Sequence, residues 1–297
     1  MTLSIITVNL NNLEGLRKTY DSIASQAFRD FEWVVVDGGS TDGSKQFIEA
    51  HAHSMAYWCS EPDKGIYNAM NKGIAHAKGS WLQFLNSGDY LHAPDTLQRV
   101  FDTPHEDADL LFGDTLLIYH EGGHVRYVEM HGRGSFNTLR QYCATVWYHQ
   151  SMFYKRDIFS EMSYDESYRI AADTDLNTRL AMKGMRFKHL PIFISYFDTN
   201  GISHSPIGNS ERKRTDGVVF EHVLRNGNED PLLFYKMFHH RACFAILENT
   251  GKILTLTFKI LEHLEAWRVR LRNALRRKED GRRNETTAAT GNGGRKA

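Results

Sequence analysis

The chain of 297 residues has few cysteines, no excess charge of either sign and no long apolar run. Its three cysteines are odd in number, lie far apart and form no CxxC pair, which argues against a disulfide framework or zinc ribbon and favours a reducing cytoplasm. The 36 basic residues balance 36 acidic ones, so a protein that wraps nucleic acid is disfavoured. No apolar run reaches the roughly 18 residues of a membrane span, and the N-terminus lacks the basic residues of a signal peptide.

Strand and helix patterns alternate over the first 115 residues. Short runs rich in β-branched and aromatic residues are typical of strands buried on both faces. The expected strands are 3–8, 31–36, 55–59 and 81–85. The segments between them have apolar residues at helical spacing, and the expected helices are 13–25, 44–51 and 66–77. This alternation predicts a doubly wound α/β sheet, mostly parallel and flanked by helices.

The pattern changes after residue 110. Further short strands are expected at 110–112, 116–119, 125–130 and 152–154, with a hairpin turn at residues 121–123. A helix follows at 171–183, and the strand-like segment 187–197 contains Pro191, which predicts an irregular or edge strand. Residues 200–230 are polar and loop-rich, whereas 231–278 has a helical pattern. The tail 279–297 lacks apolar periodicity and is expected to be disordered.

Acidic residues follow two of the expected strands. Asp37 comes after FEWVVV and Asp89 shortly after WLQFL. Ligands bind at the carboxyl edge of such sheets, where one carboxylate can accept hydrogen bonds from a nucleoside and another can hold a divalent cation against a diphosphate. The plainer alternative is that each aspartate caps a turn.

The most distinctive stretch is EPDKGIYNAMNKG, residues 61–73. The other notable motifs are, in chain order, TVNLNN, VVVDGGSTDGS, FLNSGD, AADTDLNTRL and FDTNGIS. Together they resemble, in order and spacing over residues 1–205, the family 2 inverting glycosyltransferases, and in particular bacterial exopolysaccharide enzymes of the colanic-acid type. The resemblance implies a Rossmann-like GT-A domain at 1–205. A helical extension would follow at 206–278.

The resemblance also implies roles for single residues. The nucleotide would contact Thr7, Asn9, Asp37, Asp63 and Lys64. Asp89 would bind Mg²⁺ or Mn²⁺, although the upstream acidic position of the family motif is Asn86 or Gly88 here, so the metal would bind weakly without nucleotide. Met70 stands where the family often has Arg, and either Lys64 or Lys72 would supply that charge.

Inverting transfer needs a base that deprotonates the acceptor hydroxyl. Asp173 matches the family's catalytic aspartate, with Ala172 in place of the preceding glutamate, and Asp175 is the alternative. Either is also favourable at a helix N-terminus. Asn86, His149, Gln150 and Asp175 would lie near the donor or acceptor sugar, and a histidine packed in the core is the alternative for His149.

Two further patterns need interpretation. Residues 120–124 read HEGGH, but the zinc-protease motif HExxH works only on a helix, and two glycines in a strand–turn–strand pattern disfavour one. Residues 254–275 have apolar side chains at helical spacing, and basic residues crowd 268–278. This helix would either lie on an anionic membrane surface or pack on the catalytic domain.

The sequence and the resemblance together predict a hexosyltransferase at the cytoplasmic membrane face. It would move a sugar from a nucleotide sugar, with UDP favoured over GDP, to a saccharide acceptor that is lipid-linked, for a cell-surface polysaccharide. The alternative is a non-catalytic module that binds a nucleotide sugar or a saccharide on the same fold.

Overall fold

The computed structural model describes residues 1–121, 123–143, 145–199 and 206–226. Met1–Val219 form one compact unit, and only residues 220–226 of the second unit are among those described. The expected domain boundary lies at residue 205, whereas the first unit continues to Val219. The expected helix at 231–278, its membrane contact and the tail at 279–297 lie outside the described residues.

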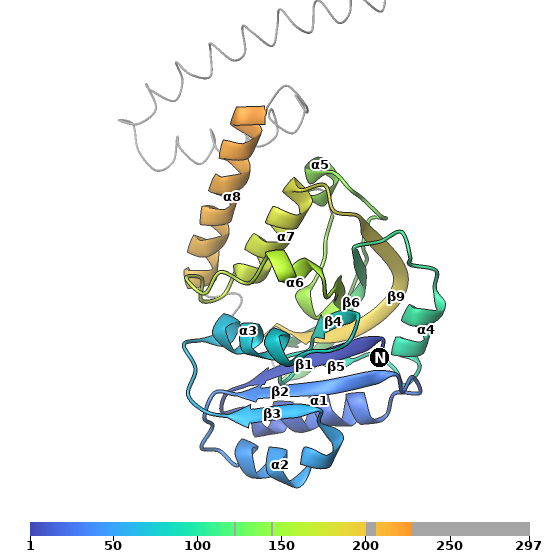
Figure 1. Ribbon diagram of the computed structural model, residues 1–297, viewed down its shortest axis with the longest axis vertical. Helices are drawn as coiled ribbons and strands as arrows, with labels where there is room; N and C mark the ends of the chain where they lie inside the picture. Colours follow the sequence, from blue (N-terminus) through green and yellow to red (C-terminus); the bar gives the residue numbers. More distant parts are fainter. Residues whose placement is uncertain (122, 144, 200–205, 227–297) are drawn as a thin grey trace, which may run out of the picture. The chain divides into compact units, whose positions relative to one another are not determined.

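The N-terminal half forms the parallel part of the sheet, as the alternating pattern predicts. Its strands run in the order β3-β2-β1-β4 and are all parallel. They are β1 (Leu3–Asn9), β2 (Phe31–Asp37), β3 (Tyr57–Ser60) and β4 (Trp81–Phe84). The helices between them are α1 (Leu13–Ala24), α2 (Ser44–Ala50) and α3 (Ile66–His76). Figure 1 shows α1 and α2 below this part of the sheet and α3 above it.

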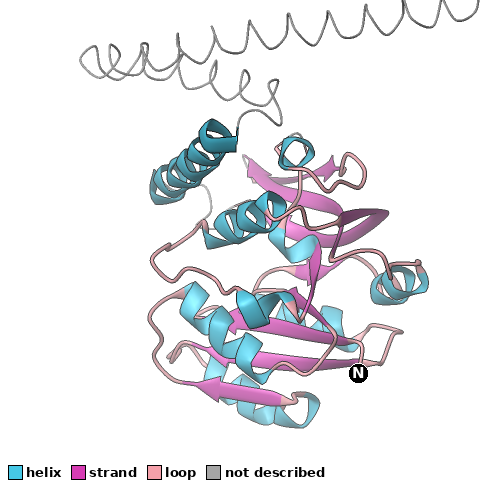
Figure 2. Ribbon diagram, turned by 45° about the horizontal axis from the view of Figure 1, so that its top comes forward, coloured by secondary structure: helices cyan, strands magenta, loops and turns pink. Residues whose placement is uncertain are grey.

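The second half extends the same sheet with strands of both directions. The order continues β4-β8-β6-β9-β5, with β7 paired to β6, and β8 is antiparallel to both β4 and β6. The strands are β5 (Tyr90–Leu91), β6 (Leu110–Glu121), β7 (His124–Met130), β8 (Met152–Lys155) and β9 (Phe187–Asp198). The helices are α4 (Thr96–Asp102), α5 (Leu139–Tyr142), α6 (Ile158–Glu161), α7 (Ala172–Met182) and α8 (Pro206–Asn226), and Figure 2 shows them around the magenta strands.

Two apolar cores lie on the two faces of the sheet. Side chains alternate between the faces of a strand, so Leu3 and Ile5 of β1 pack with α1, α2 and α4, whereas Ile6 and Val8 pack with α3, α6 and α7. Because both faces are covered, the polar residues that follow the strands are left at the sheet's carboxyl edge.

The segments 110–112 and 116–119 form one strand, β6, rather than the two we expect from the sequence. The polar residues between them stay in the strand because its pairing with β9 shifts there: Gly113 pairs with Leu190, and Asp114 with Phe193. The shift skips Pro191, which has no N–H to donate. β9 is thus irregular, as its proline predicts.

The prediction of a polar loop for residues 200–230 is wrong over Pro206–Asn226, which form α8. This helix lacks the apolar stripe that periodicity detects. It is held by polar contacts instead, among them hydrogen bonds from the backbone of residues 169–171 to Glu211. Tertiary contacts of this kind override local propensity.

His120, Glu121 and His124 of the HEGGH sequence lie on the paired strands β6 and β7, as the strand–turn–strand pattern predicts. His120 lies near the turn on β6, and Glu121 of β6 pairs with His124 of β7, so the two histidines do not share a helix face. His120 Nε2 instead lies 2.9 Å from Asp198 Oδ2. Within the described residues, no helix is long and apolar enough to cross a membrane.

Candidate functional site

Asp37 is the centre of a hydrogen-bonded cluster at the ends of β1 and β2. Asn9 pairs with it across the strands and donates from Nδ2 to Asp37 Oδ1 at 2.7 Å. The Ser40 amide donates to Oδ2 at 2.9 Å, the Ser60 hydroxyl to Oδ2 at 2.6 Å, and the Ser40 hydroxyl to Oδ1. Burial opposes ionisation of this fully buried carboxyl, but the hydrogen bonds from Ser40, Ser60 and Asn9 outweigh it and lower its pKa. Asp37 is therefore a charged anchor for the loop, while Asn9 Oδ1 is buried and bonds to no residue that the structure describes.

Thr7 lies inside the sheet. Its hydroxyl donates to the Leu85 carbonyl at 2.8 Å and accepts the Trp33 indole N–H at 2.9 Å, and the side chain is fully buried. The structure thus places Thr7 beneath the edge, where it links β1 to β2 and to the residue that follows β4.

Asp63 lies against the backbone that leaves β2. A Cβ atom added to Gly38 would come within 2.7 Å of Asp63 Oδ2, so a larger residue there would displace the Asp63 carboxylate. Asp63 Oδ1 accepts the Gly65 amide at 2.8 Å just before α3 begins. The loop that carries Asp63 is thereby tied to the same edge as Asp37.

The two lysines proposed to supply the missing charge differ in their surroundings. Lys72 is paired with Glu61 at 2.7 Å, whereas exposed Lys64 forms no ion pair with any described residue. Met70 is only 1% exposed and packs into the core, so its position on α3 does not face the edge. Lys64 is therefore the lysine whose charge is available to an anion.

The Asn86–Asp89 segment forms a tight turn after β4. The Asp89 amide donates to the Asn86 carbonyl at 2.9 Å, and Gly88 has a φ of 105°, a conformation that favours glycine. Thr19 of α1 holds this turn: its hydroxyl lies 2.7 Å from the Asp89 carbonyl and accepts the Gly88 amide at 3.1 Å. The position of the Asp89 side chain thus depends on α1.

The oxygen atoms of this turn fit a divalent cation that also binds a diphosphate. No described residue forms a hydrogen bond with the partly buried carboxyl of Asp89, and burial followed by the negative charge of Asp198 raises its pKa to about 8. Asn86 Oδ1 is also buried and has no hydrogen-bond partner among the described residues. Hard cations bind such oxygens, and Mg²⁺ commonly uses one or two carboxylates plus substrate phosphates. No group of three or more His, Cys, Asp or Glu among the described residues could hold a metal alone.

Asp173 and Asp175 have different environments although both lie in the first turn of α7. Asp173 is half-buried, accepts the Thr174 amide at 2.8 Å and forms no ion pair with a described residue. Asp175 is 6% exposed, and its carboxylate accepts the Arg179 Nε–H at 2.8 Å. Asp173 is consequently the carboxylate that a substrate could reach. The Tyr67 hydroxyl lies 3.4 Å from its Oδ1.

His149 and Gln150 lie in a short 3₁₀ helix before β8. His149 is buried, stacks on Phe84 and bonds through Nε2 to the Tyr164 hydroxyl at 2.8 Å. Burial lowers its pKa despite the negative charge of Asp173, so the ring is neutral at pH 7 and fits the packed alternative. The Gln150 carbonyl accepts a bond from Gln83, while Gln150 Nε2 is buried without a partner.

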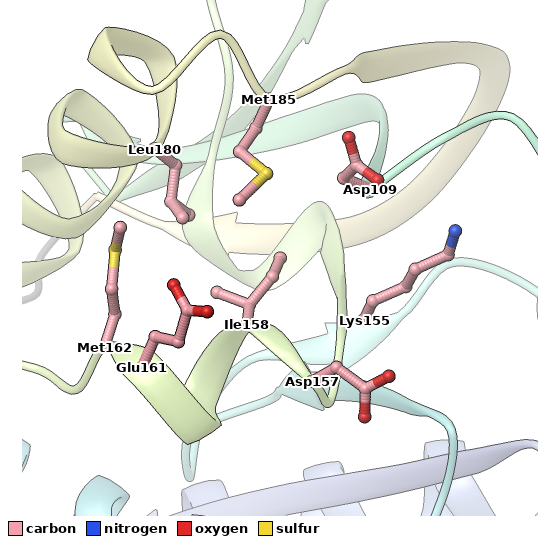
Figure 3. A pocket seen from close by; sticks show the side chains of 8 residues that line it. All are labelled: Asp109, Lys155, Asp157, Ile158, Glu161, Met162, Leu180 and Met185. Atoms are coloured by element: carbon pink, nitrogen blue, oxygen red, sulfur yellow. The ribbon is translucent and has the colours of Figure 1, made fainter.

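A separate pocket, shown in Figure 3, contains none of these residues. It is lined by Asp109, Lys155, Asp157, Ile158, Glu161, Met162, Leu180 and Met185. Lys155 pairs with Trp81, the first residue of β4, whereas Asp89 follows the last. The pocket therefore lies toward the amino end of β4, away from the Asp89 turn.

Sequence reasoning missed Thr19, Tyr67 and Asp198. Thr19 occupies a core-facing position of α1 between Leu16 and Ile23. A polar residue in the apolar stripe of a helix is a sequence signal that its side chain has a specific hydrogen-bonding role. Asp198 ends β9 within FDTNGIS, and no local pattern indicates that it faces Asp89. Only the pairing of β9 with β5 brings those two segments together.

Known proteins resemble this chain in sequence. Residues 4–164 match the family described as Glycosyl transferase family 2. A PGL/p-HBAD biosynthesis glycosyltransferase of Mycobacterium bovis is 34% identical over 220 residues, 71% of this chain and 82% of the relative. An uncharacterized glycosyltransferase of Mycobacterium tuberculosis is 34% identical over 236 residues, 76% of this chain and 83% of that protein.

Solved structures share the fold at low sequence identity. Residues 1–349 of S. aureus TarS, crystallised with UDP-GlcNAc, have a TM-score of 0.66 at 19% identity, covering 85% of this chain and 77% of that one. The mannosyltransferase PcManGT of Pyrobaculum calidifontis, in complex with GDP-Man and Mn²⁺, has a TM-score of 0.53 at 17% identity, covering 90% of this chain and 82% of that one. The family match and the mycobacterial relatives show that this chain belongs to glycosyl transferase family 2 and is a glycosyltransferase.

Proposed function

We propose that the chain transfers a sugar from a nucleotide sugar, with inversion at the anomeric carbon, to a saccharide acceptor in the biosynthesis of a cell-surface polysaccharide. We base this on one observation: Asp173 is accessible and unpaired among the described residues, whereas neighbouring Asp175 is buried against Arg179. A carboxylate without a cationic partner can accept the proton that the attacking hydroxyl must lose.

In the proposed reaction, Asp173 takes the proton of an acceptor hydroxyl as its oxygen bonds to the anomeric carbon. The bond from that carbon to the diphosphate breaks on the opposite face, and the nucleoside diphosphate leaves with the electron pair. Three residues are proposed to hold the donor: Asp63, Lys64 and Asn9. Asn9 would use its Oδ1, which bonds to none of the described residues.

Asp89 and Asn86 would hold Mg²⁺ or Mn²⁺, which, when bound, neutralises negative charge on the departing diphosphate. Asp37 and Thr7 act beneath this surface by fixing the strand ends. His149 is packed against Phe84 and Tyr164 and would support the site from within the core.

The donor and acceptor classes are also proposals. TarS was crystallised with UDP-GlcNAc and PcManGT with GDP-Man, so both nucleotides are reasonable, and we favour a UDP-sugar. The mycobacterial relative is named for PGL/p-HBAD biosynthesis. We propose a lipid-linked saccharide as the acceptor, met at the cytoplasmic face of the membrane.

The test begins with a screen of nucleotide sugars for thermal stabilisation with and without Mn²⁺, because a ligand that binds the native state raises its stability. Release of nucleoside diphosphate is then measured with a panel of saccharide acceptors. Asp173→Asn should bind the donor normally and lose acceptor-dependent release by about 10²-fold or more.

Asp175→Asn is the matched control, since it removes a carboxylate from the same helical turn. It should reduce stability by breaking the Arg179 pair and leave kcat of the folded enzyme within a few-fold of wild type. The opposite pattern, an active Asp173→Asn and an inactive Asp175→Asn, would transfer the role of base to Asp175. Donor binding without any release would instead support the non-catalytic alternative.

A further inference from the structure

Glu211 of α8 reaches the segment that leads into α7. The backbone amides of three consecutive residues, Arg169, Ile170 and Ala171, donate to its carboxylate at 2.7, 2.8 and 3.0 Å. Glu211 is some forty positions further along the chain, so this contact joins two distant segments. A single side chain thereby fixes three successive peptide units.

These amides belong to the three residues just before the first helical residue of α7, a helix without a side-chain N-cap. The first amides of an α-helix have no partner within the helix, and a Ser, Thr, Asp or Asn side chain commonly satisfies one of them. The N-cap of α7 is Ala171, which has no side-chain acceptor. The Glu211 carboxylate, which comes from another helix, does not bind the first amides of α7 itself; it binds the amides of the N-cap residue and of the two residues before it. Its negative charge is also favourable beside the positive end of the α7 dipole.

The same segment is held from the opposite side by α3. The Tyr67 hydroxyl donates to the Ile170 carbonyl, and the same hydroxyl lies near Asp173 Oδ1. Ile170 is therefore held at its amide by Glu211 and at its carbonyl by Tyr67, through two successive peptide groups. Asp173 lies three residues further along the chain.

Arg214 makes a second set of contacts between α8 and the segment before α7. The Arg214 guanidinium lies 4.2 Å from the centre of the Tyr168 ring, 3.5 Å from Asp165 Oδ2 and 3.1 Å from Ser167 Oγ. These contacts are one helical turn beyond Glu211, so both residues project from the same side of α8. The helix is thus docked along residues 165–171 and not at a single point.

We propose that Glu211 is the positioning residue for Asp173: by binding the three amides before α7, it sets where the Asp173 carboxylate meets the acceptor hydroxyl. This role deepens the proposed function and rests on Asp173 being the base. Glu211 itself does not touch the substrate. Its effect is expected on the chemical step, because small displacements of a catalytic group reduce rate even when binding is intact.

The experiment compares Glu211→Gln and Glu211→Asp with Glu221→Gln. Glutamine keeps one acceptor oxygen but turns an NH₂ group toward amides that need acceptors, and aspartate keeps the charge on a shorter side chain. Glu221 lies further along α8, is exposed, and none of the described residues bonds to its side chain. We expect Glu211→Gln to lower kcat between about tenfold and a hundredfold with donor KM unchanged. Glu211→Asp should recover part of the rate, and Glu221→Gln should match wild type.

A double-variant cycle separates positioning from mere folding support. If Glu211 acts through Asp173, adding Glu211→Gln to Asp173→Asn should cause little further loss, because the group being positioned is already disabled. Rates are measured well below the melting transition and corrected for the folded fraction. Multiplicative losses in the double variant, a rise in donor KM with unchanged kcat, or a kcat loss equal to the loss of folded protein would each overturn the role of Glu211. Full activity of Asp173→Asn alone would instead overturn the assignment of the base.

Discussion

Replacing Thr19 with valine tests whether α1 sets the geometry of the Asn86–Asp89 turn, the proposed metal site. Valine has nearly the same shape, so no cavity forms, but the hydroxyl that meets the Asp89 carbonyl at 2.7 Å and the Gly88 amide at 3.1 Å is lost. Each such bond contributes about 0.5–1.5 kcal/mol net, so the free energy of unfolding should fall by about 1–3 kcal/mol. For a domain of this size, the melting temperature should fall by about 2–4 °C for each kcal/mol.

The functional effect should be specific to the cation-dependent part of nucleotide binding. Without the hydroxyl, the turn that presents Asp89 is less ordered, and binding must restore that order. If restoring that order uses about 1.4 kcal/mol of the binding free energy, the affinity for nucleoside diphosphate in the presence of Mn²⁺ should fall about tenfold. Affinity in EDTA should change little. Urea unfolding gives the stability, and titration calorimetry with and without Mn²⁺ gives the affinities.

Two controls make this result interpretable. Thr19→Ser keeps the hydroxyl and should bind nucleotide and Mn²⁺ like wild type. Thr96→Val removes another fully buried threonine hydroxyl, which accepts the Ala93 amide at 2.9 Å at the start of α4 and has no contact with the turn. It should lose stability without losing Mn²⁺-dependent affinity. Wild-type affinity in a folded Thr19→Val protein, or an equal loss in Thr96→Val, would refute the reasoning.

Three other outcomes are expected. Asp89→Asn should abolish turnover and the metal dependence of nucleotide binding, and retention of activity by this variant, or by wild type in EDTA, would exclude that role. Because hydrogen bonds outweigh burial and depress the pKa of Asp37 in the folded state, its stabilising effect is present above the unfolded pKa of about 3.9 and lost as pH falls through the folded value. The stability gap between wild type and Asp37→Asn, measured by urea unfolding from pH 7 to pH 2, should therefore narrow below about pH 4, and a constant gap would contradict this. Finally, the full chain should co-sediment with anionic vesicles at low salt and a chain ending at Gly251 should not; equal behaviour of the two would refute membrane binding through the C-terminal helix.

The parallel half of the fold could be predicted from sequence because its signals are local. Each buried strand is a continuous apolar run, and the residue after it is polar, so the sequence alone places Asp37 and Asp89 at the carboxyl edge. The division between Asp173 and Asp175 could not be predicted. It depends on Arg179, one helical turn away, and on burial that only packing determines.

The sequence does not predict the helix α8, for a related reason. Its residues have no apolar periodicity, and polar contacts with another segment stabilise it. Glu211 accepts hydrogen bonds from backbone amides, and Arg214 lies against the Tyr168 ring and pairs with Asp165. Such pairings leave no trace in a single sequence. Asp198 illustrates the same limit, since its proximity to Asp89 follows from strand pairing across the C-terminal half of the sheet.

The position of β8 has a consequence for the order in which the chain can fold during synthesis. The strand β4 is the last of the parallel group, and its free edge is closed only when Leu82 and Gln83 pair with Tyr154 and Phe153. Until that later segment leaves the ribosome, a nearly complete parallel sheet presents an unpaired, apolar edge strand. Such edges recruit strands from other chains. A shortened chain that ends before β8 should therefore aggregate even though it contains β1, β2, β3 and β4, and a stable shortened chain should need to retain β8.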